Sequence, residues 1–224
     1  LFPYTTLFQT GGETTNSGVS LALLQPNLSV TKTALAANGV TVVDPTNTIL
    51  EPDELVTYTV NVTNTGTTPA YDVVVDDVIP VGMRNGTATI TMVSTTLQPA
   101  GTVLTNLAPS YNSTSGLATW DFDSGTANEY NIPVGQSLRI IYTVQADANI
   151  GANLTLSNQA VARNYYSFDD DAVPSLGGVT GIREIYGPSN IAVTTLTTGP
   201  PGVLLKENPT ATNVTIGEIF TYTI

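Results

Sequence analysis

Apolar and polar residues alternate along most of the chain from Asn27 onward, and no window shows a sustained apolar stripe at helical spacing. Alternation with a period of two is typical of strands that bury one face. Clusters of Gly, Pro, Asn and Asp interrupt the pattern and favour turns. The pattern predicts strands at residues 28–34, 55–63, 71–79, 87–94, 117–123, 136–146, 153–162 and 190–197. Short strands with frequent turns predict an all-β fold, an Ig-like, Greek-key β-sandwich.

One phrase of the sequence occurs twice, and each copy contains a lysine. Leu28-Ser-Val-Thr-Lys32 precedes Glu54-Leu-Val-Thr-Tyr58-Thr-Val60, and Val203-Leu-Leu-Lys206 precedes Glu218-Ile-Phe-Thr-Tyr222-Thr-Ile224. Self-similarity of this kind predicts a repeat array. We therefore expect a sandwich repeat at residues 26–198, a semi-rigid hinge at 199–202 that is stiffened by its two prolines, and the truncated start of the next repeat at 203–224.

Residues 1–25 precede the alternating pattern. Their opening, Leu1-Phe-Pro-Tyr-Thr-Thr-Leu-Phe8, resembles a translated adaptor sequence, so we expect 1–25 to be a non-native tail or part of a preceding segment. No stretch approaches the roughly 20 apolar residues of a membrane-spanning helix. No membrane contact is therefore expected from the 224 residues.

Composition narrows the functional classes. The 224 residues carry a net charge of -12 and contain neither cysteine nor histidine. The acidity disfavours nucleic acid and anionic membranes as partners. The missing residue types exclude thiol chemistry, His-based triads and zinc sites with Cys or His ligands. The sequence thus predicts no enzyme, and its Cys-free, Thr- and Asn-rich composition fits an extracellular protein.

Several motifs then follow in a recognisable order: Val62-Thr-Asn-Thr-Gly66, Val73-Val-Val-Asp-Asp77-Val-Ile-Pro80, Ile141-Tyr-Thr-Val144 and Ser157-Asn158-Gln-Ala160. In this order they resemble the bacterial surface repeat family called domain of unknown function eleven. More distantly, the chain is similar to fimbrial isopeptide-forming domains of the collagen-adhesin A type. The resemblance implies a stalk module of a long cell-surface or secreted adhesin-like protein, without catalytic turnover and with neighbouring repeats as its partners.

Three polar residues are expected on inward faces. Alternation places Lys32 with Val30, Asp77 with Val75, and Asn158 with Leu156 and Ala160. A buried lysine amine, a carboxyl group and a carboxamide are what an autocatalytic isopeptide bond needs, because burial favours the neutral amine and the protonated acid. The isopeptide-forming domains are similar in placing lysine, acid and asparagine in this chain order.

Other assignments stay open from the sequence. Lys32 and Asp77 could form a buried ion pair without any cross-link. Asp76 is an alternative acid, and Asn153 and Asn190 are alternative asparagines, although alternation ranks all three lower. Lys206 has no asparagine partner in its incomplete repeat, so we expect it to be unreacted.

A second function is a glycan- or protein-binding module that recognises a host or cell-surface ligand through a long loop at 165–188. Asp169, Asp170 and Asp171 in this loop are candidate calcium ligands, as are Asp121 and Asp123. We expect no ion or cofactor to be needed for folding, since the apolar alternation is complete without one. Trp120 shares a face with Ala118 and Phe122 and is expected in the core rather than in a sugar platform.

Overall fold

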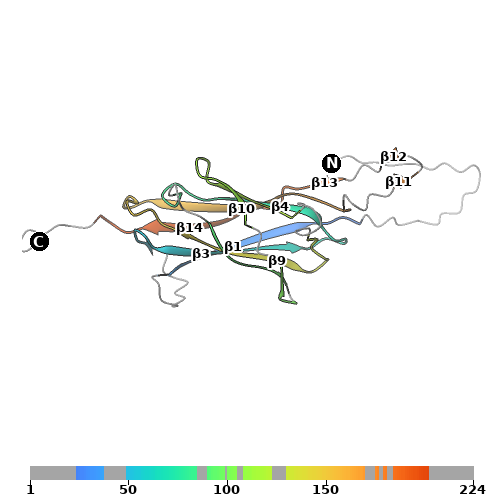
Figure 1. The fold of residues 1–224 in the computed structure, drawn as a ribbon, viewed down its shortest axis with the longest axis horizontal. Coiled ribbons are helices and arrows are strands. Elements are labelled where there is room, and N and C mark those ends of the chain that lie inside the picture. The colour runs from blue at the N-terminus through green and yellow to red at the C-terminus, as the bar shows by residue number, and fades with distance from the viewer. Residues whose placement is uncertain are drawn as a thin grey trace, which may run out of the picture.

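The computed structural model describes residues 24–37, 49–84, 90–98, 100–104, 108–122, 130–169, 175–176, 179–180 and 184–201. Within these ranges the regular elements are all strands, and none of them is a helix that could span a membrane. Two sheets pack face to face in an elongated sandwich (Figure 1). The prediction of an all-β, Ig-like β-sandwich is confirmed.

The first sheet is antiparallel and has five strands. In spatial order they are β1 (Leu28–Ala37), β3 (Leu55–Asn64), β9 (Ser137–Gln145), β5 (Thr91–Gln98) and β6 (Thr102–Val103).

The second sheet carries seven strands. Its main path is β2 (Ile49–Leu50), β14 (Ala192–Thr198), β10 (Thr155–Tyr166), β4 (Tyr71–Val78), β8 (Leu117–Asp121) and β7 (Ser110–Asn112), and β13 (Ile185–Tyr186) pairs with β10 beside that path. The β2–β14 pair is parallel and the other pairs are antiparallel. A separate small hairpin joins β11 (Ser175–Leu176) to β12 (Val179–Thr180).

The core lies between the two sheets because the strands bury alternate residues. Strand β3 alternates between buried and partly buried positions along nearly its whole length, and β9 does the same. The largest fully buried side chains are Trp120, Tyr58, Tyr142 and Phe122. Trp120 therefore lies in the core, as its alternation with Ala118 and Phe122 predicts.

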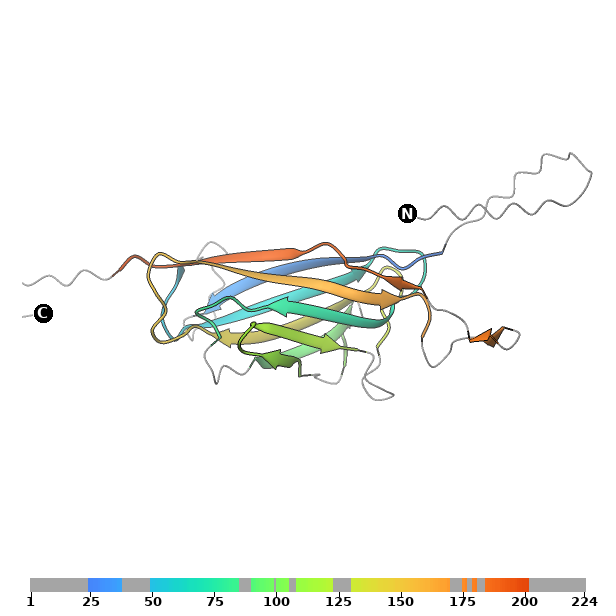
Figure 2. The ribbon, with the colours of Figure 1, turned by 90° about the horizontal axis from the view of Figure 1, so that it is seen from above.

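The chain enters and leaves the sandwich at opposite ends. Figure 2 shows β1 starting at one end of the long axis and β14 finishing at the other, with the two strands side by side. Asn190 joins them just before β14: its Nδ2 donates to the Val30 carbonyl at 2.7 Å and its Oδ1 accepts from the Val30 amide at 2.8 Å. The amide side chain thus supplies two strand-like hydrogen bonds between the sheets.

The motif Val62-Thr-Asn-Thr-Gly66 forms the turn that follows β3. The Asn64 carboxamide donates to the carbonyls of Thr68 and Ile132, both at 2.8 Å, and accepts from the Gly66 amide at 3.0 Å. A side chain at Gly66 would collide with the backbone of residues 25–27, which crosses the turn there. Asparagine and glycine are therefore both required where the chain enters β1.

The sequence-based boundaries differ most from the structure at two places. The strand predicted at 87–94 runs from Thr91 to Gln98, and residues 85–89 lie outside the described part. The loop predicted at 165–188 begins too early, because Tyr165 and Tyr166 end β10. A bulge between Ala162 and Asn164 shifts the alternation, so the Tyr165 side chain points inward. Its ring stacks on that of Tyr186, with the ring centres 5.9 Å apart.

Candidate functional site

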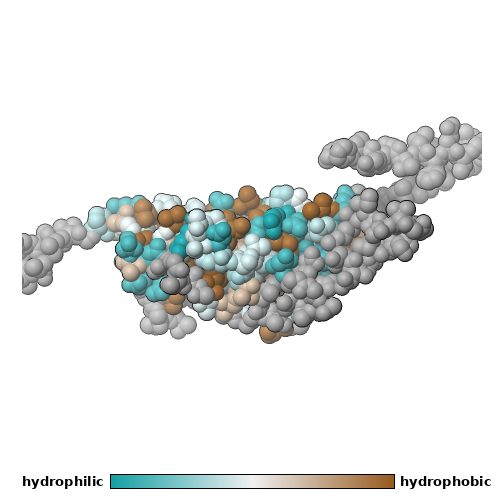
Figure 3. Space-filling model, turned by 45° about the horizontal axis from the view of Figure 1, so that its top comes forward, coloured by the Kyte–Doolittle hydropathy of each residue, from teal (hydrophilic) through white to brown (hydrophobic). Residues whose placement is uncertain are grey.

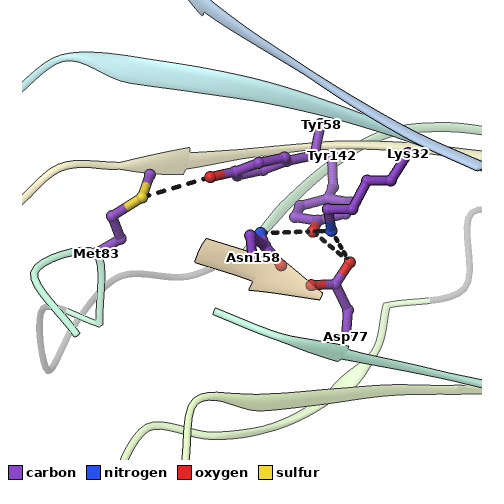
Figure 4. Close-up of polar contacts among 6 residues, drawn as sticks. All are labelled: Lys32, Tyr58, Asp77, Met83, Tyr142 and Asn158. Atoms are coloured by element: carbon purple, nitrogen blue, oxygen red, sulfur yellow. Dashed lines mark hydrogen bonds and ion pairs between the residues drawn. The ribbon is translucent and has the colours of Figure 1, made fainter. Parts of the chain in front are cut away.

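A cluster of polar side chains lies in the middle of the apolar core. We call it the lysine cluster: Lys32 from β1 and Tyr142 from β9 come from the first sheet, and Asp77 from β4 and Asn158 from β10 come from the second (Figure 4). All four residues are buried, with Asp77, Tyr142 and Asn158 at 0% exposure. The cluster therefore spans the interface between the sheets.

Strand register explains how the second sheet contributes two of these groups. Asp77 is paired with Ala160 across the β4–β10 ladder, and Asn158 is two residues along β10 from that partner. Positions two apart share a face, so the Asp77 carboxyl and the Asn158 carboxamide are diagonal neighbours on the inner face.

Register also sets the first sheet. Tyr58 and Tyr142 are paired directly across β3 and β9, and Lys32 is paired with Val60 on the other side of β3. The lysine is thus two residues from the position opposite Tyr58. Its amine lies 4.7 Å from the Tyr58 ring centre and 5.3 Å from the Tyr142 ring centre.

Hydrogen bonds connect the cluster through one hydroxyl group. The Lys32 amine donates to Asp77 Oδ2, with which it forms an ion pair, and to the Tyr142 hydroxyl oxygen at 2.8 Å. The Tyr142 hydroxyl donates to Asp77 Oδ2 at 2.6 Å. The Asn158 amide nitrogen donates to the same tyrosine oxygen at 3.4 Å. Lysine and asparagine are therefore both within hydrogen-bond range of a single oxygen atom.

Burial shifts the protonation of the two charged groups toward neutrality. Desolvation lowers the pKa of Lys32 to about 8, against the opposing attraction of Asp77. Desolvation also raises the pKa of Asp77, against the opposing effects of Lys32 and Tyr142. Because both side chains are completely shielded from solvent, the neutral amine and the protonated carboxyl are more accessible here than at a protein surface.

Aromatic rings enclose the amine and keep water away. Tyr58 and Tyr142 stack with ring centres 5.3 Å apart, and Trp120 lies 5.2 Å from Tyr142. The Tyr58 hydroxyl donates to the Met83 sulfur at 3.5 Å, and burial raises the pKa of Tyr58. These contacts bury the lysine amine among aromatic rings.

Two oxygen atoms in the cluster have no hydrogen-bond donor within the described part of the chain. They are Asp77 Oδ1 and Asn158 Oδ1, and both are buried. Figure 4 shows the Asp77 carboxyl directed toward the Asn158 carboxamide. Two buried acceptors without a donor are costly unless a proton lies between them.

The alternative residues considered from the sequence lie elsewhere. Asp76 is on the opposite face of β4, where its carboxylate pairs with the Arg163 guanidinium at 3.1 Å and accepts from the Thr119 hydroxyl at 2.8 Å. Asn153 is exposed and Asn190 is bound to the Val30 backbone. None of the three alternatives reaches the lysine cluster, which agrees with the ranking from alternation.

The acidic residues proposed for calcium do not form a site in the described part. Asp170, Asp171 and Asp123 lie outside the described residues, as does Lys206, and only Asp169 and Asp121 can be placed. The described residues contain no group of three or more carboxylate, His or Cys side chains that could hold a metal ion. Residues 170–174, 177–178 and 181–183 of the predicted 165–188 binding loop also lie outside them, and its described part contains the end of β10 and strands β11, β12 and β13.

Sequence reasoning missed the two tyrosines of the site. Tyr58 and Tyr142 occupy inward positions in their strands, so alternation alone assigns them to the core. A buried tyrosine hydroxyl requires a polar partner, and that requirement was the available signal. Two inward tyrosines in a chain with an inward lysine and an inward acid point to a shared polar network.

Comparisons with known proteins give only a fold-level likeness. No protein-family model and no curated protein matches the chain. Among solved structures, the CARDB domain of the PF1109 protein from Pyrococcus furiosus is 13% identical with a TM-score of 0.35, covering 80% of this chain and 94% of that one.

Two further structures come from surface proteins. The T6 backbone pilin of serotype M6 Streptococcus pyogenes is 14% identical with a TM-score of 0.36, covering 77% of this chain and 36% of the pilin chain. The collagen-binding subdomain ACE19 of the Enterococcus faecalis surface protein ACE is 13% identical with a TM-score of 0.25, covering 72% and 94%. At these scores the likeness indicates nothing about function. The chemistry of this chain has to be inferred from the geometry of the lysine cluster.

Proposed function

We propose that this chain is an extracellular structural module, a stalk or spacer repeat of a bacterial surface or secreted adhesin-like protein, locked by an isopeptide bond between Lys32 and Asn158. The observation that carries the proposal is the lysine cluster. An amine, an acid and a carboxamide meet in a closed apolar core and share one hydroxyl group. The extended sandwich, with chain entry and exit at opposite ends, suits a spacer in a linear array.

The proposed reaction is an acyl transfer within the chain. The neutral Lys32 amine attacks Cγ of Asn158, forming a carbon–nitrogen bond, while a proton on Asp77 Oδ1 stabilises the developing charge on Asn158 Oδ1. The bond from Cγ to Nδ2 then breaks and ammonia leaves. One proton is transferred in total from the lysine nitrogen to the departing nitrogen, and Asp77 ends in its starting state.

The two unpaired oxygens support this protonation. As an ion pair, Lys32 and Asp77 leave Asp77 Oδ1 and Asn158 Oδ1 without donors. Moving one proton from lysine to Asp77 Oδ1 makes the amine nucleophilic and supplies a donor for the Asn158 carbonyl. The same step removes two buried charges, which are expensive to keep in an apolar interior.

A purely structural ion pair explains the cluster less well. Replacing a buried ion pair by apolar residues is often neutral or stabilising, so such a pair is a weak source of stability. A buried unpaired carbonyl costs about 1–3 kcal/mol in addition. A covalent bond between β1 and β10 offsets these costs, because it ties the two sheets together and constrains the unfolded chain by roughly 5 kcal/mol.

Intact mass of the purified protein tests the proposal. The linked chain weighs one ammonia less than its sequence, and peptide mapping finds residues 32 and 158 in one branched fragment. Lys32→Ala, Asp77→Ala and Asn158→Ala each restore the full mass. Matched controls are Asp76→Ala on the outer face of β4 and Asn153→Ala before β10, both of which retain the ammonia loss. A wild-type protein of full sequence mass would refute the cross-link.

A further inference from the structure

Tyr142 lies at the centre of the lysine cluster, but the reaction proposed for Lys32, Asp77 and Asn158 gives its hydroxyl no role. Its hydroxyl contacts the attacking nitrogen of Lys32, the carboxyl of Asp77 and the departing nitrogen of Asn158. Asn158 Nδ2 donates to the tyrosine oxygen rather than to Asp77, whose Oδ2 accepts from Lys32 and Tyr142. A route for the proton from the attacking to the departing nitrogen therefore passes through the tyrosine.

We infer that Tyr142 is a catalytic residue of the cross-linking reaction, carrying the proton from Lys32 to Asp77 and then from Asp77 to the leaving nitrogen of Asn158. The inference rests on the proposed function, since it assigns a role within that reaction. It adds a fourth residue to the lysine, acid and asparagine.

The first half of the relay follows the existing hydrogen bonds. When the lysine nitrogen binds Cγ, it becomes positively charged and must lose a proton. That proton passes to the Tyr142 oxygen while the tyrosine gives its own proton to Asp77 Oδ2, along contacts of 2.8 and 2.6 Å. Asp77 can accept it because its Oδ1 proton has meanwhile moved to the oxygen of the tetrahedral intermediate.

The second half expels ammonia. In the tetrahedral intermediate Nδ2 has a basic lone pair, so the hydroxyl that accepted from it at 3.4 Å can now donate to it. Tyr142 recovers its proton from Asp77 Oδ2 and the intermediate returns the Oδ1 proton. Cγ–Nδ2 cleavage then releases neutral ammonia, with Tyr142 and Asp77 both regenerated.

The environment suits a neutral relay. Burial is the largest cause that raises the pKa of Tyr142 well above its ordinary value, and the Asp77 charge adds to it. The hydroxyl thus stays protonated throughout, and it acts by simultaneous gain and loss of a proton rather than as a free phenolate. The ring is fixed by Tyr58 on one side and by Trp120 on another.

The test is a rate measurement on the full chain. A short pulse of cell-free synthesis is followed by a chase, samples are quenched in denaturant, and intact mass gives the linked fraction over time. Tyr142→Phe keeps the ring and its stacking. We expect it to slow ammonia loss by roughly 100- to 10,000-fold, the usual contribution of a positioned acid or base.

Matched variants separate chemistry from packing. Tyr165→Phe removes another buried tyrosine hydroxyl, which accepts from the Leu28 amide at 3.2 Å and lies outside the lysine cluster, and should leave the rate unchanged. Tyr58→Phe removes the hydroxyl of the stacked partner. A Tyr142→Phe chain that links at the wild-type rate, or a loss of rate confined to Tyr58→Phe, would overturn the inference.

Fluorinated tyrosines at position 142 provide a second measurement if Tyr142→Phe does not fold. They keep the hydroxyl and change its acidity in steps, so a relay makes the linking rate vary systematically along the series. A constant rate along the series would show that the hydroxyl only positions its neighbours. Failure of the proposed function is distinguishable from both results, because the wild-type chain would then never lose ammonia.

Discussion

The amine of Lys32 lies 4.7 Å from the centre of the Tyr58 ring, on the strand next to its own. The ring covers the amine on the side of the first sheet and is only 1% exposed itself. Tyr58 therefore shields the reacting amine of Lys32 from water as well as packing in the core.

Tyr58→Ala should both destabilise the sandwich and slow cross-linking. Removal of a fully buried ring costs about 3–5 kcal/mol. Water entering the space also favours the charged amine, which raises the pKa of Lys32 and leaves less of the nucleophilic form. Chemical denaturation and the chase described above measure the two effects. Tyr58→Phe is the control for stability, and equal destabilisation by both variants would contradict the role of the ring.

The rate of cross-linking should depend on pH in a bell-shaped way. The reactive state has one proton shared by Lys32 and Asp77. Below the raised pKa of Asp77 the pair holds two protons and the amine is charged, and above about 8 the pair loses its last proton and Asp77 becomes ionised. Initial rates across a pH series test this. A rate that keeps rising above the pKa of Lys32 would mean that the acid is dispensable.

Loss of the bond should be visible as a loss of stability. Asn158→Ala leaves the Lys32–Asp77 ion pair in place but prevents the link, so the free energy of unfolding should fall by about 5 kcal/mol. Denaturant titration of the two proteins gives the difference. Asn153→Gly, at an exposed position whose φ of 56° suits glycine, should change stability by no more than about 0.5 kcal/mol. A similar loss in both variants would attribute the effect to something other than the link.

Removal of calcium should leave the thermal stability of the sandwich unchanged. The core of the described residues is apolar apart from the lysine cluster and a few other buried polar groups, and none of these residues gathers into a metal-binding carboxylate group. Thermal unfolding with chelator and with added calcium checks this. A large fall in melting temperature on chelation would show that the acidic segment near Asp169 supports the fold.

The sequence predicted best which face of its strand each residue occupies. Alternation within their own strands predicts inward faces for Lys32, Asp77 and Asn158, and each side chain lies in the core. This worked because the inner positions of a regular strand recur every two residues, whatever the partner strand is. The three residues meet because β1, β4 and β10 overlap in the middle of the sandwich, which alternation cannot predict.

Strand ends, a bulge and very short strands limited the other sequence-based predictions. Leu154 continues the alternation of Leu156 and Asn158 but is 40% exposed, because it precedes the first residue of β10. The bulge after Ala162 changed the face of Tyr165, and the two residues of β2 are too few to show any periodicity. Tyr142 was missed for a different reason. Its role depends on hydroxyl contacts with three other strands, and no local pattern records those.

The place of β14 has a consequence for how the module responds to tension. A bond from Lys32 to Asn158 transmits a pull on the amino-terminal side directly into β10, so residues 33–157 carry none of it. Strand β14 lies outside that closed ring and is held to β10 by the ladder from Thr155–Thr197 to Ala160–Ala192. Under force, β14 and the segment before it should therefore peel away first. The linked module should extend to about 150 Å in a single-molecule pulling experiment, against about 600 Å for Lys32→Ala. If the proposed bond forms, extension stops once residues 159–198 are drawn out, so the module has a fixed maximum length under load.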